Sequence, residues 1–242
     1  MASNVTSVSR AYSSPRIELS LARRASDWTG FIVFGAIGVW TLRRLPGVGV
    51  FLLPTLAHEL FMAGAFLIRD REKAATRHAP AQVAAYGGTF LVFGFFHAAR
   101  IFWPELLATG SGPLVATLGG FLWLAGSLLA PWSLWTLRHA FSLEAQARRM
   151  VRSGPYRHVR HPIYLGYILQ YGGLLLLYPS NVFAVVLVVW FGLTLIRMRY
   201  EEQTLAKAFP EYEVYRCATG ALFPFKIGKA FVRSGNGKVA TV

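Results

Sequence analysis

The stretch from His161 to Arg197, HPIYLGYILQYGGLLLLYPSNVFAVVLVVWFGLTLIR, holds two apolar blocks, 161–178 and 180–197, with only a short turn between them. Each block is close to the ~20 residues that a helix needs to cross the apolar core of a bilayer. The turn, Tyr178-Pro179-Ser180-Asn181, is too short and too uncharged to be a domain boundary. These residues therefore predict a hairpin of two membrane-spanning helices.

Four more apolar blocks precede this hairpin, at 28–42, 46–68, 82–103 and 113–137. Apolar residues make up 54% of the 242 residues and charged residues 15%, whereas soluble domains have about 45–50% and about 25%. The first block is short for a complete span. We therefore expect an all-α integral membrane bundle of five to six transmembrane helices.

Basic residues lie mainly between the apolar blocks, and they predict the orientation of the chain. If the N-terminus is cytoplasmic, only Arg43, Arg44 and Arg100 of the 25 Lys and Arg lie on the opposite side, as expected when positive loops face the cytoplasm. Both termini are then cytoplasmic in a multi-pass protein. This distribution accounts for the net charge of +14 through contact with membrane lipids, so we expect no nucleic-acid partner. Cys217 is the only cysteine, which excludes an intramolecular disulfide.

The sequence divides into four regions of different composition. Residues 1–27 are rich in Ser, Ala and Arg and read as a disordered, basic cytoplasmic leader. Residues 28–136 form a plain half with the first four helices. Residues 137–225 are dense in Arg, His, Tyr and Glu, so we expect the catalytic half there, with two transmembrane helices and a cytoplasmic cofactor pocket. Residues 226–242 are predicted to be a flexible basic tail.

The segment 151–166, VRSGPYRHVRHPIYLG, joins the fourth block to the fifth on the predicted cytoplasmic side. Gly154-Pro155 is a turn signal, and Pro162 suits the first turn of a helix. Arg160 and His161 then lie near the positive end of a membrane helix, which can receive an anionic or polar ligand group. The alternative is that the arginines only meet lipid phosphates.

The segment 197–205, RMRYEEQTL, follows the sixth block. In an unbroken helix, Arg197 and Glu201 are i,i+4 neighbours and could form a simple interfacial salt bridge. The two glutamates could instead accept ribose hydroxyls, and carboxylates and aromatic faces suit a cationic sulfonium. Phe209, Tyr212 and Tyr215 predict an amphipathic helix that continues along the membrane interface.

Three motifs together resemble one enzyme family. They are LRHAFS at 137–142 with SGPYRHVRHPIYLG at 153–166, then Glu201-Glu202, and FPEYEVY at 209–215. They resemble the isoprenylcysteine carboxyl methyltransferase family, whose wider group includes phospholipid N-methyltransferases. The resemblance covers about 137–225. It implies a small helical membrane enzyme that takes a methyl group from S-adenosylmethionine.

The family's site residues carry over to matching positions of this sequence. The resemblance implies that Arg197 and Glu201 are catalytic, Arg197 by orienting or neutralising the acceptor. It implies a cofactor site made by Tyr156, His161, Pro162, Tyr164, Leu165, Gly166 and Glu202. The acceptor would be lipophilic and enter from the bilayer: a prenylcysteine-type carboxylate, an amine-headed lipid or a small thiol. This chain has only two acidic residues in the cluster, Glu201 and Glu202, and they are preceded by Tyr200. In this respect it departs from the enzymes that act on prenylated proteins.

Two other functions are open to the same residues. A membrane reductase of the sterol-reductase type would use NADPH, although Glu201 and Glu202 would repel its 2′-phosphate. A non-enzymatic scaffold would leave the segment 156–166 without a role. His58, Glu59 and His97 fall inside predicted spans, where ionisable groups are either paired or functional. Their spacing does not match a metal site.

Overall fold

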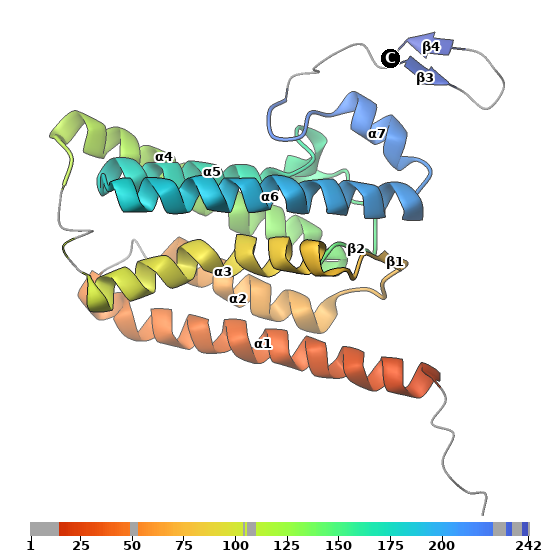
Figure 1. Cartoon of the computed structure of the whole chain (residues 1–242), viewed down its shortest axis with the longest axis horizontal. Helices are drawn as coiled ribbons and strands as arrows, with labels where there is room; N and C mark the ends of the chain where they lie inside the picture. Colours follow the sequence, from red (N-terminus) through yellow and green to blue (C-terminus); the bar gives the residue numbers. More distant parts are fainter. Residues whose placement is uncertain are drawn as a thin grey trace, which may run out of the picture.

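In the computed structural model the backbone is described for residues 15–48, 53–103, 105, 110–224, 231–233 and 239–241. Side chains are described for 27–43, 53–95, 98–99, 102–103, 105 and 110–224. The described chain is mostly helical, as predicted, and its long helices run alongside one another (Figure 1). The helices are α1 (Pro15–Val48), α2 (Leu53–Ile68), α3 (Ala79–Phe102), α4 (Pro113–Leu137), α5 (Pro162–Leu177), α6 (Asn181–Ala208) and α7 (Tyr212–Ala218), with 3-10 turns η3 (Arg138–Ala140) and η4 (Gly154–Arg157).

Within the described residues, two helical segments are long and apolar enough to cross a bilayer. They are Pro113–Ala140, which is α4 with η3, and α6, each 28 residues long. Helices α2 and α5 are also apolar but have 16 residues each. Large apolar side chains face outward from α4 and α6, for example Leu114 at 84% exposed and Val188 at 73%. Such a surface suits lipid, because lipid tails cover apolar side chains without cost.

The observed helices and strands do not follow the expected region bounds in three places. Helix α1 starts at Pro15, so residues 15–27 of the expected disordered leader are helical, and it continues to Val48 past the expected start of the second block at 46. Pro15 suits a first helical turn, and the Leu, Ala and Arg residues after it are strong helix formers. The tail also holds regular structure, because β3 (Phe231–Arg233) pairs antiparallel with β4 (Val239–Thr241).

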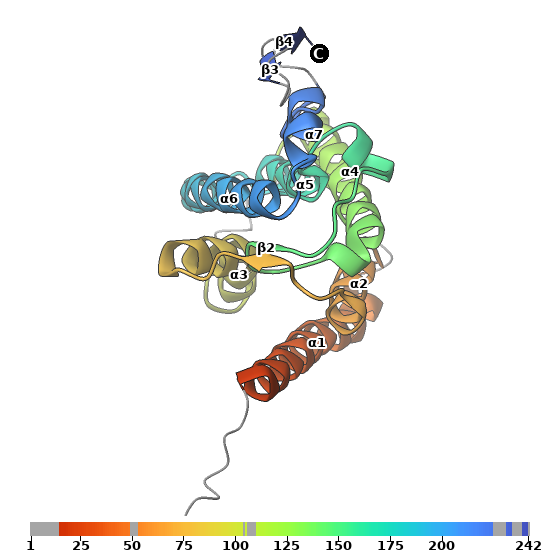
Figure 2. The ribbon, with the colours of Figure 1, turned by 90° about the vertical axis from the view of Figure 1, so that its right-hand side faces the viewer.

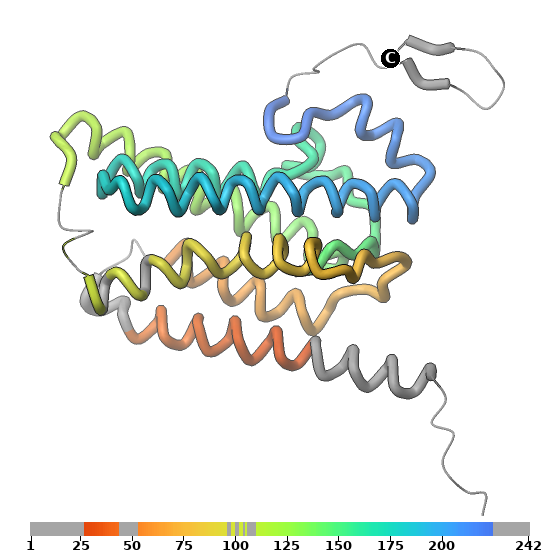
Figure 3. The backbone as a smooth tube through the Cα atoms, in the orientation of Figure 1, coloured from red at the N-terminus to blue at the C-terminus, as the bar shows by residue number. Residues whose placement is uncertain are grey.

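The helices pack in pairs that are not all neighbours in sequence. Helix α1 packs along α2, α4 along α5, and α3 along α6. Viewed end-on, α5 and α6 lie in one layer above α3, and α4 and α2 close one side (Figure 2). The predicted turn at 178–181 does join α5 to α6, and the backbone trace shows α7 at the same end of the bundle as η4 and the 138–153 connection (Figure 3).

Glycines allow the backbones of α4 and α5 to touch. A Cβ added to Gly173 would lie 2.5 Å from the carbonyl oxygen of Gly119, and one added to Gly126 would overlap the carbonyl oxygen of Gly166. Small residues at such crossings permit the close van der Waals packing that holds membrane helices together. Gly119 belongs to this crossing, whereas a Cβ on the neighbouring Gly120 would meet nothing within 4 Å.

A small sheet joins two distant connections at the polar end of the bundle. Strand β1 (Ala74–Ala75) follows α2, and it pairs antiparallel with β2 (Gln146–Ala147), which follows α4. The backbone N–H of Asp70 also donates to the carbonyl of His139 at 2.7 Å. These bonds fold the segment after α4 back across the helix ends.

The ionisable residues of α2 have neutral partners. The Nε2 atom of His58 lies 2.8 Å from the hydroxyl of Tyr167 on α5. Glu59 is buried and hydrogen-bonded to Thr41 of α1. Both contacts join neighbouring helices, which fits a packing role. The side chain of His97, the third ionisable residue expected inside a span, lies outside the described residues.

The α4–α5 crossing predicts a sharp difference between two glycines of α4. Gly126→Ala should lower the free energy of unfolding by about 1–3 kcal/mol, because the added methyl has to push the helices apart. Gly120→Ala should leave stability unchanged or raise it slightly, since its Cβ meets nothing within 4 Å and alanine is the better helix former. Thermal unfolding in detergent measures both, and equal midpoints would contradict the packing argument.

Candidate functional site

A pocket opens between the polar end of the bundle and the apolar helices. It encloses about 1050 Å³, including the part open to solvent. Its walls come from α2, α3, α4, α5, α6, α7 and the connection between α4 and α5. Met62, Leu137 and Ile163 give an apolar lining, whereas Glu201, Arg149 and His161 give a polar one that includes two charges. The pocket therefore suits a ligand with one polar and one apolar part.

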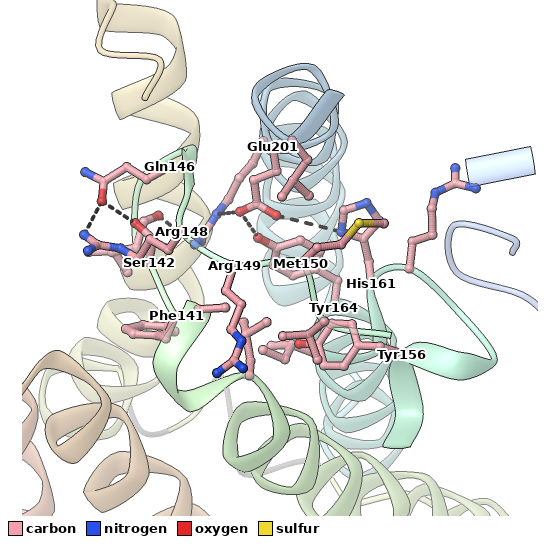
Figure 4. A pocket seen from close by; sticks show the side chains of 18 of the residues that line it. Phe141, Ser142, Gln146, Arg148, Arg149, Met150, Tyr156, His161, Tyr164 and Glu201 are labelled. Atoms are coloured by element: carbon pink, nitrogen blue, oxygen red, sulfur yellow. Dashed lines mark hydrogen bonds and ion pairs between the residues drawn. The ribbon is translucent and has the colours of Figure 1, made fainter. Parts of the chain in front are cut away.

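Glu201 is the centre of the charged lining (Figure 4). Its Oε1 accepts from Arg197 Nε at 2.9 Å and from the Tyr164 hydroxyl at 2.5 Å. Its Oε2 lies 3.8 Å from Nδ1 of His161. Because α6 is unbroken here, Arg197 and Glu201 are the i,i+4 pair that the sequence predicted.

Glu202, one residue later, holds the other side of His161. Its Oε1 lies 3.0 Å from His161 Nε2 and accepts from Arg160 Nε at 2.8 Å. Burial raises the pKa of this carboxyl, but hydrogen bonds and charge from His161 and Arg160 lower it further, so the pKa lies below its usual value. Glu202 lies beyond the apolar part of α6, and its ionised carboxylate fixes the His161 ring between the two glutamates.

Arg197 joins three parts of the fold. It is 7% exposed, and besides Glu201 it donates to Thr89 Oγ1 at 3.0 Å and to the carbonyl of Ala85 at 3.3 Å on α3. It also donates to the carbonyl of Leu143 at 2.7 Å. Four of the five N–H donors of a guanidinium are thus used within the protein. Arg197 lines the pocket, but its contacts position Glu201 and the 138–151 segment.

The segment after α6 closes the site from outside. The Tyr215 hydroxyl donates to the carbonyl of Tyr156 at 2.6 Å, and the backbone N–H groups of Arg160 and His161 donate to Gly220 and Ala221. Burial raises the pKa of Tyr215 to about 12, so this phenol stays protonated and keeps donating. The predicted amphipathic interface helix is wrong. Phe209, Tyr212 and Tyr215 are buried against the site, and α7 has only seven residues.

The residues that sequence motifs singled out fall into three places. Those that line the pocket are Tyr156, His161, Tyr164, Arg197 and Glu201. Glu202 lies behind His161 and is not part of the lining. Pro162, Leu165 and Gly166 do not line the pocket either. Gly166 contacts α4, where its Cβ would lie 2.9 Å from the backbone nitrogen of Ala130, so its place is explained by helix packing.

Several lining residues were missed. Phe141, Gln146, Arg149 and Met150 come from the connection after α4, and Tyr167 comes from the second turn of α5. The β1–β2 pairing brings the connection over the pocket, and nothing local in the sequence signals that pairing. The motif at 137–142 was the available signal, since it lies where this connection begins.

The pocket lining contains an unsatisfied hydroxyl group. The hydroxyl of Tyr212 is buried without a hydrogen-bond partner among the described residues, in a side chain that is 2% exposed. A buried hydroxyl without a partner costs about 1–3 kcal/mol. A ligand in the pocket could supply the missing partner. In the part of the chain that is described, no group of three or more His, Cys, Asp and Glu could hold a metal ion.

The contacts of Arg197 predict a structural effect of its removal. Arg197→Ala should destabilise the protein by about 3 kcal/mol, because it breaks an ion pair whose arginine is buried, leaves the partly buried Glu201 without its counter-charge and removes the contacts to α3 and Leu143. Arg199→Ala, on the exposed side of the same helix, is the matched control and should change stability by less than about 0.5 kcal/mol. Unfolding followed by circular dichroism in detergent compares them. Equal effects of the two substitutions would contradict the positioning role of Arg197.

Comparison with known proteins places this region in a family. The family model described as "Phospholipid methyltransferase" matches residues 114–212. The chain is also 35% identical over 117 residues to the "Cobalt-zinc-cadmium resistance protein CzcN" of Cupriavidus metallidurans, over 48% of this chain and 52% of that protein. The match thus spans about half the length of this relative. Residues 114–212, which hold most of α4, all of α5 and α6 and most of the pocket lining, thus match a family of the isoprenylcysteine/phospholipid methyltransferase superfamily, as the motifs indicated.

Proposed function

We propose that this chain is a membrane methyltransferase that uses S-adenosylmethionine to methylate a lipophilic acceptor. The observation that carries the proposal is a pocket, lined mostly by residues of the region that matches the family, that joins charged and aromatic walls to an apolar lining. Methyl transfer between a polar cofactor and an apolar acceptor requires such a pocket. Members of this family of methyltransferases generally use S-adenosylmethionine.

The residues present fit that cofactor. S-adenosylmethionine carries a cationic sulfonium, and the aromatic face of Tyr156 in the lining suits a cation. The Tyr164 ring beside it already contacts the Arg197 guanidinium and stacks on His161. Glu201 can accept hydrogen bonds from hydroxyl or ammonium groups, and the unpaired hydroxyl of Tyr212 can make one more bond. His161, held by Glu202, completes the polar wall. We propose that these five residues hold the cofactor.

The chemistry then requires mainly positioning. When bound, the cofactor supplies a methyl carbon activated by its sulfonium. The protein has to hold donor and acceptor about 3–3.5 Å apart in a site from which water is excluded. Met62, Leu137 and Ile163 would hold the apolar part of the acceptor. A carboxylate acceptor gives up no proton, whereas an amine or thiol must lose one, and His161 lies beside Glu201 to receive it.

We propose that the chain crosses the membrane several times, with the polar end of the bundle and both termini in the cytoplasm. The cofactor would then enter the pocket from the cytoplasm and the acceptor from the bilayer. The distribution of Lys and Arg supports this orientation. The apolar outer faces of α4 and α6 support the contact with lipid.

Calorimetric titration of the detergent-solubilised protein with S-adenosylmethionine and with NADPH tests the proposal. We expect the wild-type protein to bind S-adenosylmethionine, and His161→Ala and Glu202→Ala to weaken that binding about tenfold or more, since they dismantle the polar wall. Arg157→Gln is the control, because Arg157 is exposed and does not line the pocket. Binding of NADPH alone would favour a reductase, and binding of neither compound would contradict an enzyme of either class.

Tyr212→Phe separates ligand binding from stability. It removes only a hydroxyl that has no partner among the described residues, so we expect the thermal unfolding midpoint to stay equal or rise. Binding of S-adenosylmethionine should weaken about threefold to tenfold, the usual effect of one hydrogen bond. A lower unfolding midpoint with unchanged binding would show that the hydroxyl serves the fold and not the ligand.

A further inference from the structure

Four arginines line the pocket, and three of them have partners within the protein. Arg160 donates to Glu202, and Arg197 donates to Glu201. Arg148 donates to the carbonyl of Asp70 and, at 2.5 Å, to Oε1 of Gln146. Arg149 is different. Among the described residues its guanidinium has no hydrogen bond, ion pair or aromatic contact, although it lines the pocket.

The charges around Arg149 do not supply an anion for it. Glu144 and Glu201 are the carboxylates of the lining. Glu201 is occupied by Arg197 and Tyr164, and Glu144 accepts from Tyr86 and Gln146. If Glu202, which lies behind the lining, is added to these two carboxylates, the four arginines still outnumber the three glutamates. The pocket therefore has an excess positive charge, and Arg149 is where that charge is available.

The backbone holds Arg149 in place. It follows β2, whose Ala147 accepts a backbone hydrogen bond from Lys73 at 2.6 Å, and the preceding Arg148 is buried. In Figure 4 the guanidinium of Arg149 lies between Phe141 on one side and Tyr156 and Tyr164 on the other. Arg149 is exposed and lies two residues beyond β2, so its backbone is anchored next to the pocket while its guanidinium is accessible to a ligand. Arg157 is also exposed but does not line the pocket.

We propose that Arg149 is a carboxylate-binding residue of the pocket. The guanidinium presents a planar pair of N–H donors that matches a carboxylate with two parallel hydrogen bonds. The assignment rests on the proposed function, in which two bound molecules can carry this group. One is the amino-acid end of S-adenosylmethionine, and the other is an acceptor of the prenylcysteine type. The chemistry at Arg149 is the same for both.

Pairs of ligands that differ only in the carboxylate test the assignment. The first pair is S-adenosylmethionine and decarboxylated S-adenosylmethionine, titrated into wild-type protein and Arg149→Gln in detergent. If the cofactor supplies the carboxylate, the substitution should weaken binding of S-adenosylmethionine about tenfold or more and leave binding of the decarboxylated compound unchanged. Arg157→Gln should change neither affinity, which controls for the loss of one positive charge.

The second pair is N-acetyl-S-farnesylcysteine and its carboxamide. If the acceptor supplies the carboxylate, Arg149→Gln should lower the affinity for the acid to that for the amide and leave binding of S-adenosylmethionine unchanged. Arg149→Gln with wild-type affinity ratios for both pairs would overturn the proposal. A wild-type protein that binds no S-adenosylmethionine would contradict the proposed function instead, and the farnesylcysteine pair would then decide the role of Arg149 alone.

Discussion

A guanidinium that leaves water needs a carboxylate and several oxygen acceptors around it, because an unpaired buried charge is among the most costly groups in a protein. Arg197 finds these acceptors on three separate segments: Glu201 on its own helix, Thr89 and the Ala85 carbonyl on α3, and the Leu143 carbonyl after α4. No one of these segments could satisfy it alone. The ion pair therefore makes the positions of α3, α6 and the connection after α4 depend on one another.

The glycine crossing of α4 and α5 sets the second limit on the site. Gly126 and Gly166 bring the two backbones so close that α5 has little freedom to slide along α4. The start of α5 carries His161 and Tyr164, and α6 carries Glu201 and Glu202. With α5 fixed on α4 and α6 fixed by Arg197, the His161 ring is held between two glutamates. The pocket is therefore built by helix packing, and its polar contacts complete it.

The parts of the fold that sequence could predict are those set by local pattern. The α5–α6 turn, the extent of α4 and the i,i+4 contact of Arg197 with Glu201 follow from apolar blocks and helical spacing. The β1–β2 pairing joins residues that are about 70 positions apart in the sequence. Each of the two strands has only two residues. Such a pairing leaves no periodicity to read. Arg149 and Gln146 were missed for that reason, because only this pairing brings them to the pocket.

The sequence pattern predicted that Tyr212 and Tyr215 lie along the membrane interface, and this prediction failed for a different physical reason. An amphipathic pattern of aromatic and polar residues suits a membrane interface as well as a packed protein surface. The choice between the two depends on whether the rest of the chain offers a surface to cover. Here Ala147 and the Tyr156 carbonyl offer one, so the aromatic side of α7 packs inward. The same pattern in a chain without the β1–β2 pairing would have no such surface.

The charges of the pocket also bear on how a cationic cofactor could be chosen. Glu201 and Glu202 are each neutralised by an arginine within hydrogen-bond distance, so the carboxylates attract a free cation less than their number suggests. The excess arginine charge acts against it further. Under the proposed function, recognition of a sulfonium would then rest on groups that attract a cation without a formal charge, and the aromatic face of Tyr156 in the lining is such a group. In that proposal the glutamates orient neighbouring side chains and accept ligand hydrogen bonds, and they contribute little net attraction for a cation.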